Sequence, residues 1–253
     1  MRIDDIGASS KIFEVYGREY FNISGIKIPV PLLPNFLFFK YIPPFKKWGV
    51  YREMTVHEWD EILTLLKKYH ARITVAVTAT WVERNGSLVP FHKKFPDEAS
   101  ALKKGLRDEL IEVANHGLTH CVVGQHLPRL FSSNRKYHRE FWDWLPEKLH
   151  QEHIKKSQEI LESYFDTRVT TFIPPGNVFS KNTIKACKDN GIKLINCNTH
   201  ARMLDGIKII SNDDIIDFHD REIVMYGLDW FRNLLEKHKD VEKTWVKNIA
   251  GYN

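Results

Sequence analysis

The sequence predicts a single α/β domain built as a distorted or incomplete (β/α)7 barrel of the TIM type. Apolar, β-branched segments alternate with amphipathic helical segments along most of the 253 residues, as expected for parallel βαβ units. The chain is 43% hydrophobic and long enough to bury one large core, and barrels of this length are commonly single domains. Polar side chains follow five predicted strands, and barrels carry their functional sites at the carboxyl ends of the strands.

Seven segments are apolar or alternating enough to be predicted as strands. They are residues 1–6, 72–78, 110–114, 169–173, 192–196, 206–210 and 215–218. The predicted helices are residues 55–69, 97–107, 147–164, 180–190 and 229–239, and residues 81–96 are predicted to be a loop. The first helix begins with Thr55 followed three residues later by Glu58, which is the capping-box pattern. A doubly wound open sheet is the alternative, but no glycine-rich phosphate loop follows the first strand.

Two long segments, residues 16–50 and 121–146, lack a clean period and are interpreted as loop insertions in this domain. The stretch 28–45 is apolar and aromatic but contains five prolines, so it is too interrupted to span a bilayer. We interpret it as a loop packed over the barrel end, with a lid, an oligomer contact or a patch touching a lipid carrier as alternatives. In the second insertion Trp142 and Trp144 either join a buried aromatic cluster or stack on sugar rings.

The composition excludes several classes of protein. The formal net charge is +5, and the basic residues are scattered, which argues against nucleic acid as a partner. The three cysteines form no CxxC pair, which fits a reducing compartment without a disulfide framework. The first residues are charged and no segment resembles a signal peptide or a transmembrane helix. We therefore expect a cytoplasmic protein, for which a peripheral membrane contact stays open.

The most informative stretch is residues 115–120 (NHGLTH), in which His116 and His120 follow an apolar predicted strand. Imidazole is the commonest nitrogen ligand of metals in proteins. A spacing of four would place both rings on the same side of one helical turn. Catalytic metal sites usually have three protein ligands, and the best supplier of the third is the pair Asp4 and Asp5, which ends the first predicted strand.

Four motifs follow one another along the chain, each at the end of a predicted strand. They are Asp4-Asp5, the two histidines of NHGLTH, the segment 172–177 (FIPPGN) and His219-Asp220. Each is weak evidence alone, but their order resembles the polysaccharide deacetylase, or NodB-homology, family of carbohydrate esterases over about residues 1–222. The matches are partial. One residue is inserted between Asp5 and Gly7, and Gly117 stands where the family has Ser or Thr.

The resemblance implies a role for each motif. Asp5, His116 and His120 would hold one divalent metal ion, commonly zinc, although cobalt, nickel and iron suit these ligands as well. The remaining roles are those of Asp4 as general base toward the attacking water, of His219 as general acid toward the leaving amine, and of backbone N–H groups near Pro175, Gly176 and Asn177 as oxyanion donors. Amide hydrolysis needs these functions on physical grounds too, because its water nucleophile and its leaving amine are both poor at neutral pH.

One departure concerns the arginine of the third family motif, which usually pairs with the base carboxylate and is replaced here by Ile173. Arg2 lies two residues before Asp4 and hence on the same strand face, and Arg221 follows the last motif. We expect one of these two guanidinium groups to take over, with Asp220 as a further residue that would orient the site. The hypothesis requires a guanidinium within about 6 Å of the Asp4 carboxylate.

Three functions fit this sequence. The first is a metal-dependent hydrolase that removes an N-acetyl group from an amino sugar, in the synthesis of a surface polysaccharide such as an O-antigen. The expected cytoplasmic location favours a nucleotide- or lipid-linked sugar. The second is a deformylase or amidohydrolase acting on another small amide. The third, motivated by Ile173, is a non-catalytic metal- or glycan-binding relative, because a fold does not by itself determine a function.

Overall fold

The structure is a computed structural model that describes residues 1–18, 20–29, 37–128 and 135–252. Its centre is a sheet with the strand order β12-β13-β11-β10-β9-β6-β1-β14. The strands are β1 (Arg2–Ile6), β6 (Ile73–Val77), β9 (Ile111–Asn115), β10 (Thr171–Phe172), β11 (Leu194–Cys197), β12 (Arg202–Leu204), β13 (Ile207–Ser211) and β14 (Asp217–His219). Every neighbouring pair from β14 to β13 is parallel, and only β12 is antiparallel, at the edge.

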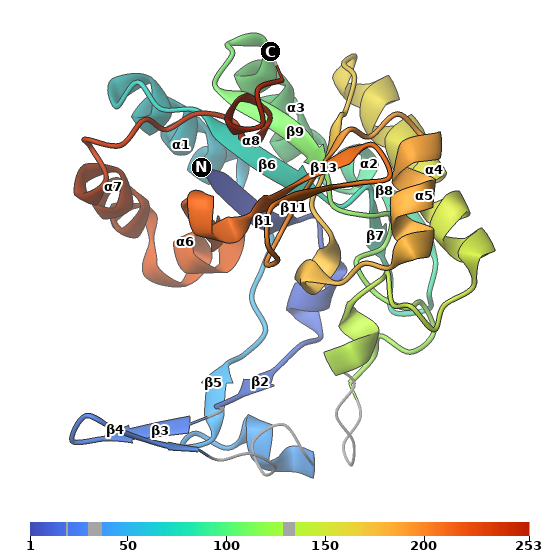
Figure 1. The fold of residues 1–253 in the computed structure, drawn as a ribbon. Coiled ribbons are helices and arrows are strands. Elements are labelled where there is room, and N and C mark those ends of the chain that lie inside the picture. The colour runs from blue at the N-terminus through green and yellow to red at the C-terminus, as the bar shows by residue number, and fades with distance from the viewer. Residues whose placement is uncertain (19, 30–36, 129–134, 253) are drawn as a thin grey trace.

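Helices surround the outer side of this sheet, as Figure 1 shows. They are α1 (Val56–Lys68), α3 (Pro96–Arg107), α4 (Glu147–Phe165), α5 (Lys181–Asp189), α6 (Asp220–Tyr226) and α7 (Leu228–Lys237). Within the described residues no ladder joins β14 to β12 or β13, so the curled sheet is an incomplete barrel. The predicted fold class, a distorted or incomplete (β/α)7 barrel, is confirmed.

Local sequence signals account for the helix starts. The Thr55 side chain accepts the N–H of Glu58, and the Glu58 carboxylate accepts the N–H of Thr55, which is the predicted capping box. The prediction of a loop over residues 81–96 is wrong. The strands β7 (Thr80–Val82) and β8 (Leu88–Pro90) form a hairpin there, followed by α2 (Phe91–Lys94). A three-residue strand is too short to show a period in the sequence.

Side-chain alternation divides each strand between the helices and the barrel interior. Outward residues such as Ile3, Val75 and Val113 belong to the main hydrophobic cluster with the surrounding helices. The alternate positions face inward and include several polar side chains: Arg2, Asp4, Thr74, Glu112, Thr171 and Asn196, all of them buried. The parallel register therefore directs the carboxylate of Asp4 into the interior near the carboxyl ends of the strands.

The chain returns at its carboxyl end to close the opposite end of the barrel. Backbone N–H groups of α8 (Val246–Ile249) donate to Thr74 Oγ1 at 2.8 Å and to Glu112 Oε2 at 3.3 Å. The side chain of Val246 packs in a buried cluster with Leu194 and neighbouring apolar residues. This contact seals the end of the barrel where the strands begin, and so it leaves the other end as the accessible one.

The two predicted insertions differ from each other. The prediction of an irregular loop is wrong for the first insertion, which contains four short strands. The strand β2 (Tyr16–Gly17) pairs with β5 (Lys46–Trp48), and β3 (Tyr20–Ile23) forms a hairpin with β4 (Ile26–Pro29). This segment, residues 16–48, is here named the arm, and Figure 1 shows that its described residues protrude from the barrel instead of packing over its end. Residues 30–36 of the arm lie outside the described residues. The second insertion is mainly irregular, with the short 3-10 helix η3 (Arg135–His138), and its residues 129–134 also lie outside them.

Two further observations complete the fold. Cys121, Cys187 and Cys197 are free and buried. In the part of the chain that the structure describes, no helix is both long enough and apolar enough to cross a membrane.

A buried ion network ties the segment after β1 to the last strand of the barrel. Lys11, in the 3-10 helix η1 (Ser9–Ile12), donates to Glu53 Oε2 at 2.7 Å and to the carboxylate of Asp220. Tyr51 donates to Asp220 Oδ1 at 3.0 Å. Burial raises the pKa of Asp220 to about 7 even though Lys11 counteracts the shift. Burial would lower the pKa of Lys11, but Asp220 and Glu53 together raise it above its usual value. The lysine is therefore a fixed cation that compensates two buried acids.

We expect the substitution Lys11→Met to lower the free energy of unfolding by about 3–5 kcal/mol, because it leaves two buried carboxylates without a cation. Urea denaturation measures the loss. The matched control is Lys67→Met, which breaks an ion pair of similar length, 2.7 Å to Asp108, between side chains that are 57% and 34% exposed. That change should cost no more than about 1 kcal/mol. Equal losses in the two variants would contradict the assignment.

Candidate active site

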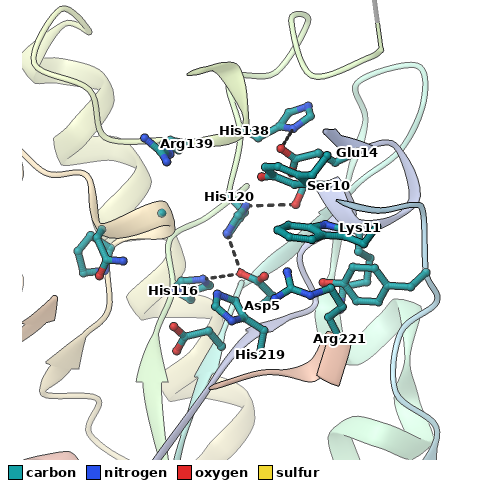
Figure 2. Close-up of a pocket in the computed structure, with 17 residues that line it drawn as sticks. Asp5, Ser10, Lys11, Glu14, His116, His120, His138, Arg139, His219 and Arg221 are labelled. Atoms are coloured by element: carbon teal, nitrogen blue, oxygen red, sulfur yellow. Dashed lines mark hydrogen bonds and ion pairs between the residues drawn. The ribbon is translucent and has the colours of Figure 1, made fainter. Parts of the chain in front are cut away.

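Three potential metal ligands converge at the carboxyl end of the barrel. Asp5 Oδ1 lies 3.3 Å from His116 Nε2 and 3.1 Å from His120 Nε2. One ligating atom from each residue lies within 4.8 Å of those of the other two. Figure 2 shows the carboxylate of Asp5 between the two imidazoles, with His219 beside it. The first strand and the segment after β9, more than a hundred residues apart in sequence, thus meet at one point.

The local backbone explains how the two histidines converge. The prediction of a helical turn is wrong, because residues 116–120 form a loop with positive φ at Gly117 (85°) and at His120 (60°). The buried carboxylate of Glu140 accepts the N–H groups of Leu118 at 3.0 Å, Thr119 at 3.1 Å and His120 at 2.9 Å. The loop therefore wraps around an anion, and this curvature brings the rings together.

Gly117 is required by the same carboxylate. A Cβ atom at this position would lie 2.2 Å from Glu140 Oε2, well inside van der Waals contact, and the positive φ also disfavours other residues. The glycine that stands where the family pattern has Ser or Thr is thus explained by Glu140, which no sequence pattern had indicated. His153 holds Glu140 in turn, with its Nδ1 at 2.5 Å from Oε1.

The donor set fits a divalent cation. His116 Nδ1 lies 2.6 Å from the carbonyl oxygen of Ile173, and because a carbonyl only accepts, the ring must donate from Nδ1. A neutral ring then presents its Nε2 lone pair to the Asp5 carboxylate, so that two acceptors face each other. A cation among them would remove this repulsion, and a carboxylate with two imidazoles is a common zinc ligand set.

Electrostatics keep Asp5 ionised. Burial would raise the pKa of Asp5, but the adjoining imidazoles of His116 and His120 and the charge of His219 outweigh it and hold the pKa well below its usual range. Asp5 also adopts a positive φ of 70°, at the point where the register between β1 and β6 shifts. This irregular residue turns the carboxylate out of the strand toward the histidines.

Asp4 is held by Arg2. The Arg2 guanidinium donates to Asp4 Oδ2 at 2.8 Å, and the side chains are 1% and 8% exposed. The distance lies well inside the 6 Å that the hypothesis of a substituting arginine required. Among the described residues Asp4 Oδ1 has no hydrogen-bond partner, so one carboxylate oxygen is held and the other is available. Ile173, where the family pattern has arginine, packs with Ala76 and Ala114 in a small apolar cluster.

The last motif lies beside the first in the sheet. His219 is directly opposite Asp4 in the pairing of β14 with β1. Burial would lower the pKa of His219, but the charges of Asp5 and Asp4 raise it above the usual value. Arg221 pairs with Glu222 at 2.6 Å and lies over the ring of Trp48 at 4.1 Å, and Asp220 is engaged by Lys11. Of the candidates for orienting Asp4, Arg2 is therefore the one in contact with it.

These groups line a cavity of about 260 Å³. Asp4, Asp5, His116, His120, Pro174, Gly176, Asn177, His219 and Arg221 belong to its wall, together with residues that the sequence had not indicated: Ser10, Lys11, Glu14, Tyr16, Trp48, Tyr51, His138 and Arg139. Pro175, Trp142 and Trp144 are absent from this lining, so a stacking role of the two tryptophans stays a prediction. The tryptophan in this lining is instead Trp48 of the arm.

The newly found residues surround the ligand cluster on several sides. Ser10 Oγ lies 3.3 Å from His120 Nδ1, and Glu14 pairs with His138 Nδ1 at 2.8 Å. Arg139 packs on Gly176, where a Cβ would lie 2.5 Å from its Nε atom. No local sequence signal marks Ser10 or Glu14. Trp48 lies in the first insertion and Arg139 in the second. The only sequence signal for a functional role of either residue is its position in a long predicted loop, because loops often carry functional residues.

Solved structures of other proteins share parts of this architecture. A 4-alpha-glucanotransferase from Thermococcus litoralis is 9% identical, with a TM-score of 0.50 over 78% of this chain and 37% of that chain. A CE4 family pseudoenzyme from Bacillus anthracis is 16% identical, with a TM-score of 0.46 over 77% of this chain and 60% of that one. The peptidoglycan deacetylase PdaC from Bacillus subtilis is 17% identical, with a TM-score of 0.48, and the coverages are 78% and 85%. At these identities the likeness concerns the fold alone.

No curated protein matches the sequence significantly. A family model described as polysaccharide deacetylase, however, matches residues 51–195, more than half of the chain. The match includes the segment with His116 and His120 and the third motif around Gly176. The chain therefore belongs to the polysaccharide deacetylase, or NodB-homology, family.

Proposed function

We propose that this protein is a metal-dependent hydrolase that removes the N-acetyl group of an amino sugar. The observation that carries the proposal is the convergence of Asp5, His116 and His120 beside Asp4 and His219 in one cavity. Family membership supports deacetylation as the reaction class. The positions of the two carboxylates and the three histidines support the division of roles among them that follows.

Asp5, His116 and His120 would hold one divalent ion, zinc being the expected metal. When bound there, the ion would lower the pKa of a water toward about 7 and polarise the acetyl carbonyl. The carbonyl oxygen of Ile173 orients the ring of His116, which directs Nε2 toward the ligand cluster. Ser10 lies within reach of the outer nitrogen of His120 in the same way.

Asp4 would act as the general base. Its Oδ2 is held by Arg2 and its Oδ1 is available to accept a proton from the attacking water. Once water has added to the carbonyl carbon, His219 would donate its proton to the nitrogen, the C–N bond would break, and acetate and a free amine would leave. Gly176 lies on the cavity wall, and its backbone N–H would be the oxyanion donor there. The N–H of Asn177 already donates to the carbonyl oxygen of Pro174 at 2.9 Å.

The substrate we propose is a nucleotide- or lipid-linked N-acetylated sugar in the synthesis of a surface polysaccharide. Two guanidinium groups, those of Arg139 and Arg221, line the cavity, and cations at a cavity mouth attract an anionic carrier group such as a phosphate. Trp48 supplies an aromatic face near Arg221, which suits a sugar ring.

A non-catalytic role is the second candidate, and the observation that favours it is the loss of the motif arginine at Ile173. The contact between Arg2 and Asp4 weighs against it, because a guanidinium reaches the base carboxylate from another strand. The two functions differ in a measurable outcome, since only the first releases acetate.

The direct test is acetate release from N-acetylated sugars, free, nucleotide-linked and lipid-linked, by protein loaded with zinc. We expect release from at least one sugar class, its loss after chelation and its recovery when metal is restored. Absence of release from every sugar class, with Asp4→Asn indistinguishable from wild type, would contradict the proposal. Release of formate in place of acetate from formylated analogues would identify a deformylase.

Substitutions should distinguish the residues that bind the metal from the residue that accepts a proton. His116→Ala and His120→Ala should abolish stoichiometric zinc binding as measured by elemental analysis, whereas Asp4→Asn should keep the metal and lower kcat by about 10²–10⁴-fold, the usual contribution of a general base. The control is His57→Ala, at an exposed position of α1, which should change neither quantity. Loss of metal in Asp4→Asn would instead make Asp4 a ligand.

The activity should fall on the alkaline side as His219 loses its proton, because a general acid must be protonated. Since the pKa of His219 is raised, we expect this limb of the kcat/KM profile above pH 6.5, the ordinary value for histidine. His219→Gln should lower kcat by at least about a hundredfold and remove the limb. If His219→Gln keeps the alkaline fall of kcat/KM seen in the wild type, His219 is excluded as the titrating group.

A further inference from the structure

The hairpin of the arm is amphipathic. In the pairing of β3 with β4, Phe21 is opposite Ile28 and Ile23 is opposite Ile26, and directly opposite residues share one face of a two-stranded ribbon. One face is therefore entirely apolar: Phe21, Ile23, Ile26 and Ile28. The other face carries Tyr20, Asn22, Lys27 and Pro29. The turn residues Ser24 and Gly25 both have positive φ (52° and 86°), which fixes the register of the hairpin.

The apolar face is uncovered at its tip. Ile23 is 58% exposed, Ile26 is 67% exposed and Ile28 is 45% exposed. Phe21, nearer the root, is partly covered by Phe45, with ring centroids 5.7 Å apart. Single exposed apolar residues are ordinary, but a contiguous patch of β-branched side chains at the end of a protruding element indicates a binding surface.

The charge of the arm indicates the partner. The arm, residues 16–48, contains five basic residues and one acidic residue. Lys27, Lys46 and Lys47 are exposed, and among the described residues none of the three forms an ion pair. Lys27 lies 5.0 Å from the ring centroid of Tyr20, and Lys47 lies 4.6 Å from that of Trp48. Lysines beside aromatic rings, next to aliphatic side chains, are the residue types that favour the interface of an anionic bilayer.

We propose that the arm docks on the surface of a membrane that contains anionic lipids. The isoleucines of the hairpin would enter the boundary between headgroups and acyl chains, and Lys27, Lys46 and Lys47 would contact anionic headgroups. The arm protrudes from the barrel in Figure 1, so it can reach a bilayer without obstruction from the helices. A protein partner would need an acidic and apolar groove, whereas a bilayer offers both features over an unlimited area.

The root of the arm joins this surface to the cavity. Trp48 of β5 lines the cavity and packs on Tyr16 of β2, with ring centroids 4.4 Å apart. A docked arm would thus hold the cavity mouth near the headgroups. A substrate carried on a lipid would be presented there, although docking itself uses none of the catalytic groups.

Co-sedimentation with vesicles tests the proposal. We expect the wild-type protein to bind vesicles of phosphatidylcholine mixed with phosphatidylglycerol, to bind phosphatidylcholine alone much more weakly, and to dissociate as salt is added. The triple variant Lys27→Glu, Lys46→Glu, Lys47→Glu should bind on the order of a hundredfold more weakly, because each basic residue near an anionic surface contributes about a factor of five. Ile23→Ser with Ile26→Ser should weaken binding at least about tenfold.

Matched controls lie outside the arm. Lys148, Lys181 and Lys188, exposed lysines of α4 and α5, are changed together to Glu, and Met203, which is 61% exposed, is changed to Ser. Both controls should bind vesicles within about twofold of wild type, although the first carries the same change in charge and the second also replaces an exposed apolar side chain with Ser. Circular dichroism and acetate release from a water-soluble substrate should be unchanged in the isoleucine variant, which shows that the barrel remains folded.

Several outcomes would overturn docking on a membrane. One is the absence of wild-type sedimentation with anionic vesicles, and another is equal sedimentation of the arm variants and their controls. A third is a wild-type dimer that binds no vesicles and becomes monomeric with Ile23→Ser and Ile26→Ser, which would assign the apolar face to a second copy of the chain. Vesicle binding is measured without turnover, so its failure is distinguishable from failure of the proposed deacetylase activity.

Discussion

The guanidinium of Arg2 is the interaction on which the site depends most. It is almost fully buried, and besides Asp4 it reaches Asn196, Asn212 Oδ1 at 2.9 Å and Asp217 Oδ2 at 3.2 Å. These partners belong to β1, β11, the turn after β13 and β14. They therefore span the opening between β13 and β14, two strands that no ladder joins within the described part of the chain. A single cation compensates two carboxylates, orients the proposed base and crosses the gap in the barrel.

Two other buried charges shape the remainder of the site. Glu140 bends the histidine loop by accepting three consecutive N–H groups, and Lys11 neutralises Glu53 and Asp220 directly behind His219. Each is buried with its partners, so each is costly to disrupt and leaves few alternative geometries. The cluster of Asp5, His116 and His120, the candidate metal site, is thus positioned mainly by buried ion pairs and hydrogen bonds of the surrounding loops, and less by the strands alone.

The sequence predicted the residues of the candidate site better than it predicted the structure of the two insertions. The order of motifs at strand ends grouped the pair Asp4-Asp5 with His116 and His120, because parallel strands bring their carboxyl ends to one edge. The family resemblance then singled out Asp5 as the third ligand. Arg2 could be proposed from alternation relative to Asp4. Glu140 and Trp48 could not, because their contacts depend on how the two insertions fold, and Ser10 could not, because no local signal marks it in the segment after β1. The arm was interpreted as a loop because its strands are too short for a visible period and are interrupted by prolines.

By itself, then, the sequence determined the class of fold, the capping of helix α1, and the residues that meet at the strand ends. These follow from periodicity and local hydrogen bonding, which act over a few neighbouring residues. Only the tertiary structure decided which arginine contacts Asp4, how a non-helical loop turns two imidazoles toward one carboxylate, and where the arm points. Those outcomes rest on tertiary contacts, such as those of Glu140 with the histidine loop and of Arg2 with Asn196 and Asp217, whose geometry no local pattern encodes.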